Sequence, residues 1–109
     1  MSDHTALHTA VDRLAGRLRS LPQRRLQAGA AAEGLELARW LARQAQTLEF
    51  PGREPYELPD DGIFVVGDQL AVAGNELATA LVVARDPGRG DSVRAEALER
   101  VARTAKAVG

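Results

Sequence analysis

The chain has 109 residues, of which 45% are hydrophobic and 27% charged, a composition typical of one folded domain rather than of a disordered segment. Its formal net charge is -1 and it contains no cysteine. Disulfides, thiolate nucleophiles and cysteine-based zinc sites are therefore excluded, and no global charge attracts the protein to nucleic acid or to an anionic membrane.

The core has few aromatic residues to draw on, because the chain contains one Trp, one Tyr and two Phe. It must therefore consist of Leu, Val and Ala, which let helices approach closely and favour an all-helical fold. All but one of the 14 basic residues are arginines, the exception being Lys106. Together with abundant Ala and Gly, this bias indicates a GC-rich bacterial genome.

The first expected helix covers residues 3–19. Its apolar residues recur at the spacing of an amphipathic helix; they are Leu7, Val11, Leu14 and Leu18. His4 and His8 lie one helical turn apart, as in some metal sites, but without a third strong ligand we expect solvated histidines and no metal. Pro22 interrupts the helix, because the residue before a proline resists the α conformation.

A cluster of arginines surrounds this first break: Arg13, Arg17, Arg19, Arg24 and Arg25. A phosphate-binding patch is one interpretation, and a solvated helix end is the other. Cations are favourable in the last turn of a helix, where the carbonyl ends of the peptide dipoles gather. No aromatic residue is interleaved for base stacking, so we do not expect nucleic acid as a partner.

The second expected helix covers residues 22–49 and has two apolar faces. The first is a stripe of larger residues that includes Leu37 and Leu41, and the opposite face carries small residues around Leu35. Two apolar faces indicate contacts with more than one neighbour. Trp40, the only tryptophan, flanks the first stripe and is a candidate anchor for a partner.

The third expected helix covers residues 61–85, after a proline-rich loop over residues 50–61. Residues 63–84 are apolar around most of a helical wheel. Asp68, Asn75 and Glu76 within this stretch argue against a membrane span. A β-hairpin over residues 63–73, turning at Gly67-Asp68, is the competing interpretation.

Two features of the third helix indicate contacts. Small residues recur along one ridge and permit close helix crossing: Gly67, Ala71, Gly74 and Ala78. A narrow polar stripe contains Asp68, Asn75 and Glu76, which are the candidate ligand-binding residues. The alternative is that this stripe is simply the solvent side of a mostly buried helix.

The fourth expected helix covers residues 92–108, capped by Asp91 or Ser92. Its outer face places Glu96 four residues before Arg100 and Glu99 four residues before Arg103, a spacing that permits ion pairs.

We therefore expect one all-α domain over residues 1–109, folded as a four-helix antiparallel bundle. The breadth of apolar surface on the second and third helices predicts a homodimer. Candidate interface residues are Trp40, Leu35, Gly67, Ala71, Gly74 and Ala78. No catalytic motif is present.

A non-catalytic helical interaction or accessory protein is the favoured function, with a protein partner and no cofactor. The alternative is a small-ligand or metal-binding bundle, enzymatic or not, that uses Asp68, Asn75 and Glu76. Residues 1–20 contain no apolar segment of the kind found in signal peptides, so we expect a cytoplasmic location.

Overall fold

The computed structural model describes residues 3–109, with side chains from residue 5 onward. Every regular element of this part of the chain is helical. The elements are α1 (Asp3–Ser20), α2 (Gln23–Arg25), the π-helical turn η1 (Leu26–Ala30), α3 (Ala31–Glu49), α4 (Val66–Val82) and α5 (Pro87–Val108). The all-helical prediction is confirmed, and the β-hairpin over residues 63–73 is wrong because residues 66–73 are helical.

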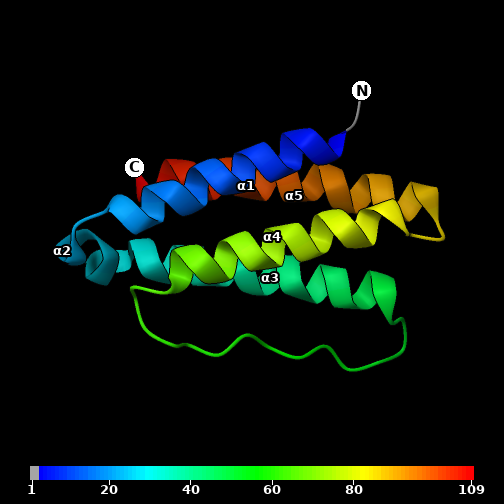
Figure 1. Ribbon diagram of the computed structural model, residues 1–109, viewed down its shortest axis with the longest axis horizontal. Coiled ribbons are helices and arrows are strands. Elements are labelled where there is room, and N and C mark those ends of the chain that lie inside the picture. The colour runs from blue at the N-terminus through cyan, green and yellow to red at the C-terminus, as the bar shows by residue number, and fades with distance from the viewer. Residues whose placement is uncertain (1–2) are drawn as a thin grey trace.

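The four long helices pack around one apolar core (Figure 1). Going around the bundle, α3 contacts α4, α4 contacts α1, α1 contacts α5, and α5 contacts α3. The most extensive contact joins α3 and α4, followed by that between α1 and α4. The largest fully buried side chains come from three helices: Leu7 and Val11 of α1, Leu41 of α3, and Leu70 and Leu77 of α4.

The helices do not alternate in direction around the bundle. In Figure 1, α1 and α5 run from right to left, whereas α3 and α4 run from left to right. The pairs α3–α4 and α1–α5 are parallel, and the pairs α1–α4 and α3–α5 are antiparallel. The prediction of an antiparallel bundle is therefore not confirmed for two of the four adjacent pairs.

The long connection over residues 50–65 makes the parallel pair α3–α4 geometrically accessible. When extended, it can reach about 50 Å, whereas α3 is about 28 Å long. The connection runs back along α3 as a strap (Figure 1). A short loop would have forced α4 to run antiparallel to α3.

Side chains of α3 and α4 hold the strap by its backbone. Gln46 Nε2 donates to the carbonyl oxygen of Tyr56 (2.9 Å), and Gln46 Oε1 accepts from the amide of the same residue (2.7 Å). Arg39 Nε donates to the carbonyl oxygen of Leu58 (2.8 Å), and Gln69 Nε2 to that of Pro59 (3.0 Å). These bonds replace the partners that an extended backbone lacks outside a sheet.

Two helix starts differ from the predictions. Helix α4 begins at Val66 rather than near residue 61, because Gly62 has a φ of 104° and its amide donates to Asp60 Oδ1 in a turn (3.0 Å). Helix α5 begins at Pro87 rather than at residue 92. Asp86 is its N-cap, with Oδ1 accepting from the amides of Gly88 (3.0 Å) and Arg89 (3.2 Å).

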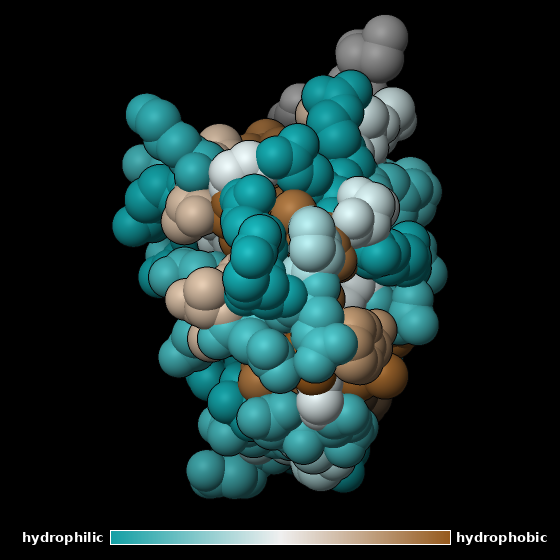
Figure 2. All heavy atoms as spheres, turned by 90° about the vertical axis from the view of Figure 1, so that its left-hand side faces the viewer, coloured by the Kyte–Doolittle hydropathy of each residue, from teal (hydrophilic) through white to brown (hydrophobic). Residues whose placement is uncertain are grey.

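The predicted second helix contains an interruption that the sequence pattern did not show. Gly29 has a φ of 143°, a conformation that L side chains rarely adopt, and it lies in the turn η1. This wide turn reverses the chain between α1 and α3 at one end of the bundle. Figure 2 looks at that end, where hydrophilic residues cover most of the surface and hydrophobic residues show between them.

Glycines bring α4 close to α1. A Cβ atom at Gly67 would lie 2.9 Å from the carbonyl oxygen of Ala15, and one at Gly74 would lie 2.5 Å from Val11 Cγ1. Both distances are shorter than van der Waals contact, so no larger residue fits without movement. No helix in the described part of the chain is both long and apolar enough to cross a membrane.

Candidate functional site

The predicted ligand-binding residues lie on the outer face of α4. Asp68, Asn75 and Glu76 are all exposed to solvent. Asp68 Oδ1 accepts from Arg19 Nε at 2.8 Å, which ties α4 to α1. Asn75 lies two helical turns further along, near Thr5 and His8 of α1.

The structure does not gather these three residues into one pocket. An α-helix rises about 1.5 Å per residue, so Asp68 and Asn75 are about 10 Å apart along the axis. Among the described residues, no group of three His, Asp or Glu side chains could hold a metal ion. His8 Nε2 instead faces Asp12 Oδ2 at 3.3 Å on the surface of α1, and the His4 side chain lies outside the described residues.

The candidate interface residues mostly contact other parts of the same chain. Gly67 and Gly74 face α1, and Leu35 is only 8% exposed. Ala71 and Ala78 are half-buried. The two glycines of the small-residue ridge therefore support packing within the bundle, whereas Ala71 and Ala78 remain partly exposed.

The outer face of α4 nevertheless carries exposed apolar side chains. Val72 is 59% exposed, Val82 65%, and Val83, the C-cap residue directly after the helix, 62%. With 100° per residue, these valines and Thr79 lie within about one third of the helix circumference. Such spacing is typical of a helix that packs against another helix. The sequence pattern contained these valines, but did not separate outward-facing from inward-facing residues, because α4 is apolar on both sides.

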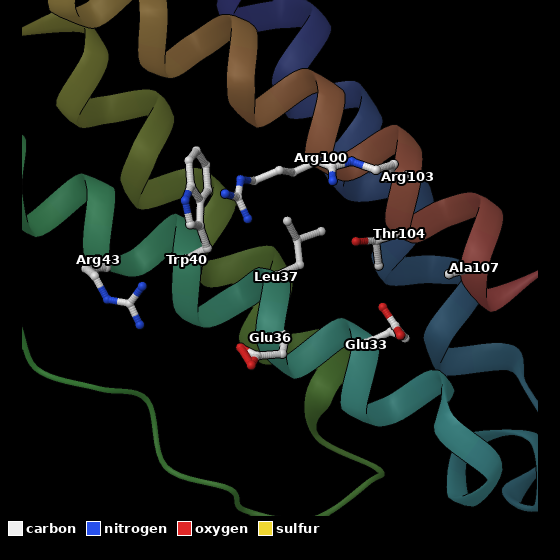
Figure 3. A pocket seen from close by; sticks show the side chains of 9 residues that line it. All are labelled: Glu33, Glu36, Leu37, Trp40, Arg43, Arg100, Arg103, Thr104 and Ala107. Carbon is white, nitrogen blue, oxygen red and sulfur yellow. The ribbon is translucent and has the colours of Figure 1, made fainter.

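A second surface feature is an open groove of about 600 Å³ between α3 and α5 (Figure 3). We call it the Trp40 groove. Leu37, Trp40 and Thr104 contribute to its walls, and charged side chains surround it. These are Glu33, Glu36 and Arg43 from α3 and Arg100 and Arg103 from α5.

The ring of Trp40 is partly covered by a side chain of the same chain. The guanidinium of Arg100 stacks over its ring at 4.5 Å from the centroid, as Figure 3 shows. Arg100 also pairs with Glu96 at 2.8 Å, which confirms the first of the two predicted ion pairs. The cation–π contact joins α3 to α5, and the salt bridge, which lies within α5, positions Arg100 for it. Glu99 and Arg103, the second predicted pair, do not meet.

The described surface offers binding contacts but no recognisable catalytic arrangement. The buried residues include no polar or charged side chain. Glu33 and Glu36 lie on the α3 wall of the Trp40 groove, no histidine is among the described residues that line it, and Thr104, its one described hydroxyl, forms no side-chain hydrogen bond with either glutamate. General acid–base catalysis requires such groups within hydrogen-bond distance of each other or of one shared water.

No protein family, curated protein or solved structure matches this chain. The functional argument therefore depends on the surface features alone.

Proposed function

We propose that this chain is a non-catalytic interaction domain that acts as a homodimer, with the outer face of α4 as the contact between subunits. The observation that supports this proposal most directly is the exposure of three valines on one face of one helix. Leaving apolar surface in water costs roughly 25 cal/mol per Å². A second copy of the same face would remove that cost for both subunits.

The positions of the valines suit a two-fold axis. In a symmetric dimer, residue i contacts residue j and residue j contacts residue i. Two copies of α4 that pack antiparallel about a point midway between Val72 and Val83 bring Val72 of each copy opposite Val83 of the other. Thr79 and Asn75 then lie near the centre, where they are small enough for close packing.

The alternative of a ligand-binding or metal-binding bundle has less support. It would need Asp68, Asn75 and Glu76 to converge on one point, but all three are exposed to solvent, and Asp68 lies two helical turns from the other two. In the dimer Asn75 instead lies near the centre of the contact, and the charged Asp68 and Glu76 lie toward its edge, which is the usual place for charged side chains.

Sedimentation velocity and light scattering at micromolar concentration test the proposal. We expect a dimer for the natural chain and a monomer for the double variant Val72→Glu, Val83→Glu. In a dimer of this variant, position 72 of each subunit would face position 83 of the other, so two buried carboxylates would repel each other at each end of the contact. The control Thr9→Glu, Ala95→Glu adds the same charge at exposed positions of α1 and α5 and should stay dimeric.

Circular dichroism should show the same helix content for all three proteins. A monomeric natural chain overturns the dimer. A double variant that remains dimeric shows that the subunits meet through a different surface, and the assignment to α4 is then wrong.

A further inference from the structure

A second groove lies between α1 and α5, on a different side of the bundle from the Trp40 groove. It has a volume of about 350 Å³, and most of its lining is apolar. The lining residues are Ala10, Arg13, Leu14 and Arg17 of α1, Leu98, Val101, Ala102 and Ala105 of α5, and Gly109, which follows α5. We call it the arginine groove.

The arginine groove exists because α1 and α5 face each other there with small side chains. Ala10 of α1 and Ala102 and Ala105 of α5 do not fill the space between the two helix axes. Leu14 and Val101 are buried beneath them. The result is an apolar trough that runs parallel to both helices.

Two arginines edge this trough, and no described residue pairs with their side chains. Of the cluster at this end of the molecule, Arg19 pairs with Asp68, and Arg25 Nη2 donates to the carbonyl oxygen of Val108 at 2.7 Å. Within the described part of the chain, the guanidinium groups of Arg13 and Arg17 form no hydrogen bond or ion pair, and Arg17 is bonded only through its backbone carbonyl, which accepts from Ser20 Oγ. Among the described residues that line the groove, no side chain is acidic, so the charged side chains at its rim are both positive.

The Trp40 groove differs in this respect. Its rim carries Glu33 and Glu36 as well as Arg43 and Arg103, so charges of both signs are already close together. Of these two grooves, the arginine groove is the one whose described lining combines an apolar floor with charged side chains of one sign at the rim. This combination specifies the chemistry of what binds there.

We propose that the arginine groove binds an amphipathic helix of a partner protein, with apolar side chains in the trough and two carboxylates one turn apart facing Arg13 and Arg17. The lining of α1 spans residues 10–17, or about 10 Å of helix, and that of α5 somewhat more. This length matches two to three turns of a bound helix. Apolar anchors at i, i+3 or i+4, and i+7 would fit it.

The spacing of the arginines adds specificity. Side chains four residues apart on a helix have Cβ atoms about 6 Å apart. Glu or Asp at positions i and i+4 of the bound helix has the same separation and can meet both guanidinium groups. Complementary charge of this kind selects partners and raises association rates more than it raises affinity.

A selection experiment tests this proposal on the full chain. The probe is a displayed library of peptides about five helical turns long, since shorter helices are marginal in water. Leu occupies the anchor positions, and each flanking position contains Glu, Lys or Ala in equal amounts. We expect the natural chain to enrich Glu over Lys by about tenfold at flanking positions four residues apart.

Two charge-reversed variants complete the experiment. Arg13→Glu, Arg17→Glu should reverse the preference, so that Lys replaces Glu in the selected peptides. Arg43→Glu, Arg103→Glu changes net charge equally but alters the Trp40 groove, and should still select Glu. All four positions are exposed or lie on the rims of grooves, and circular dichroism checks that each variant folds.

The proposal is overturned by any of three results: no peptide is selected, Glu and Lys are selected equally, or the preference persists in Arg13→Glu, Arg17→Glu. A long-chain fatty acid that displaces the bound peptides without any charge preference among them would identify the trough as a lipid site instead. Dissociation of the homodimer by Arg13→Glu, Arg17→Glu would assign the groove to a second copy of this chain, and would likewise overturn it.

Discussion

The contact between α1 and α4 and the contact between α1 and α5 involve the same helix but have opposite character. Glycines of α4 bring α1 so close that a single methyl group at Gly67 or Gly74 would overlap with it. On its other side, α1 meets alanines of α5 and a groove remains. Small residues therefore give a tightly packed helix contact only where the two backbones also approach each other. Where the backbones stay apart, small residues leave a groove that a partner can occupy.

The largest loss of stability should come from truncating a buried side chain of α4, the helix that packs closely against α1. Leu77 of α4 is 0% exposed, and Leu77→Ala should lower the free energy of unfolding by about 2–5 kcal/mol through lost burial and a new cavity. Urea denaturation measures this change. The exposed control Thr9→Ala should change stability by less than about 0.5 kcal/mol, and equal losses for both variants would contradict the close packing of α4.

Gly67→Ala and Gly16→Ala should have opposite signs. At Gly67 the new Cβ would lie 2.9 Å from a backbone oxygen of α1, and we expect a loss of about 1–3 kcal/mol. At Gly16, on the exposed face of α1, nothing lies within 4 Å of the new atom. Alanine should stabilise the helix there by about 0.5–1 kcal/mol. Thermal unfolding of both variants compares them directly, and a stabilising Gly67→Ala would show that the α1–α4 contact is not closed.

The N-cap of α5 determines where this helix begins, and therefore how long a segment of it packs in the bundle. Asp86→Ala removes the N-cap and should cost about 1 kcal/mol. Ser92→Ala, at the position where the sequence pattern suggested a cap, should have almost no effect. The pair is best measured by chemical denaturation, and the reverse order of effects would place the true start of α5 near residue 92.

The smallest change in stability is expected at the contact between α1 and α5, where the arginine groove leaves space. Ala105→Leu adds three carbon atoms to the wall of the arginine groove, where there is space for them, and should change stability by less than about 0.5 kcal/mol. A loss of more than about 1 kcal/mol in a melting experiment would mean that α1 and α5 pack more closely than the groove implies.

Sequence patterns predicted the helices well wherever buried apolar residues recur at helical spacing. The apolar stripe of α1 predicts both its extent and its buried residues. The end of α3 at Glu49 also follows from the prolines of the loop. These features depend on local chemistry, and the tertiary structure does not need to be known.

Three features could not be predicted in this way. Gly29 adopts its φ of 143° because the chain must turn between α1 and α3, which no local pattern shows. The start of α5 had a local signal, Asp86 followed by Pro87, but the nearby glycines obscured it. The direction of α4 depends on the strap, whose course is determined by side chains of the flanking helices, Arg39 and Gln46 of α3 and Gln69 of α4, and no local pattern shows that these side chains hold its backbone.

The faces of α4 could likewise not be assigned from local sequence patterns. The pattern correctly singled out α4 as the helix with apolar residues on several sides, but did not assign those sides to neighbours. Gly67 and Gly74 turned out to face α1, and Val72, Val82 and Val83 face solvent. Only the packing of the whole chain distinguishes the two faces, because both are rich in small and branched residues.

The order of the helices around the bundle has a consequence for how the chain can be divided. Helix α1 packs on α4 and α5, and so does α3, so neither the segment before the strap nor the segment after it encloses a core of its own. Each half needs the other to bury its apolar stripes. Two peptides separated within residues 50–61 should therefore be unfolded alone and fold when mixed, and two intact chains at high concentration can exchange halves across their straps.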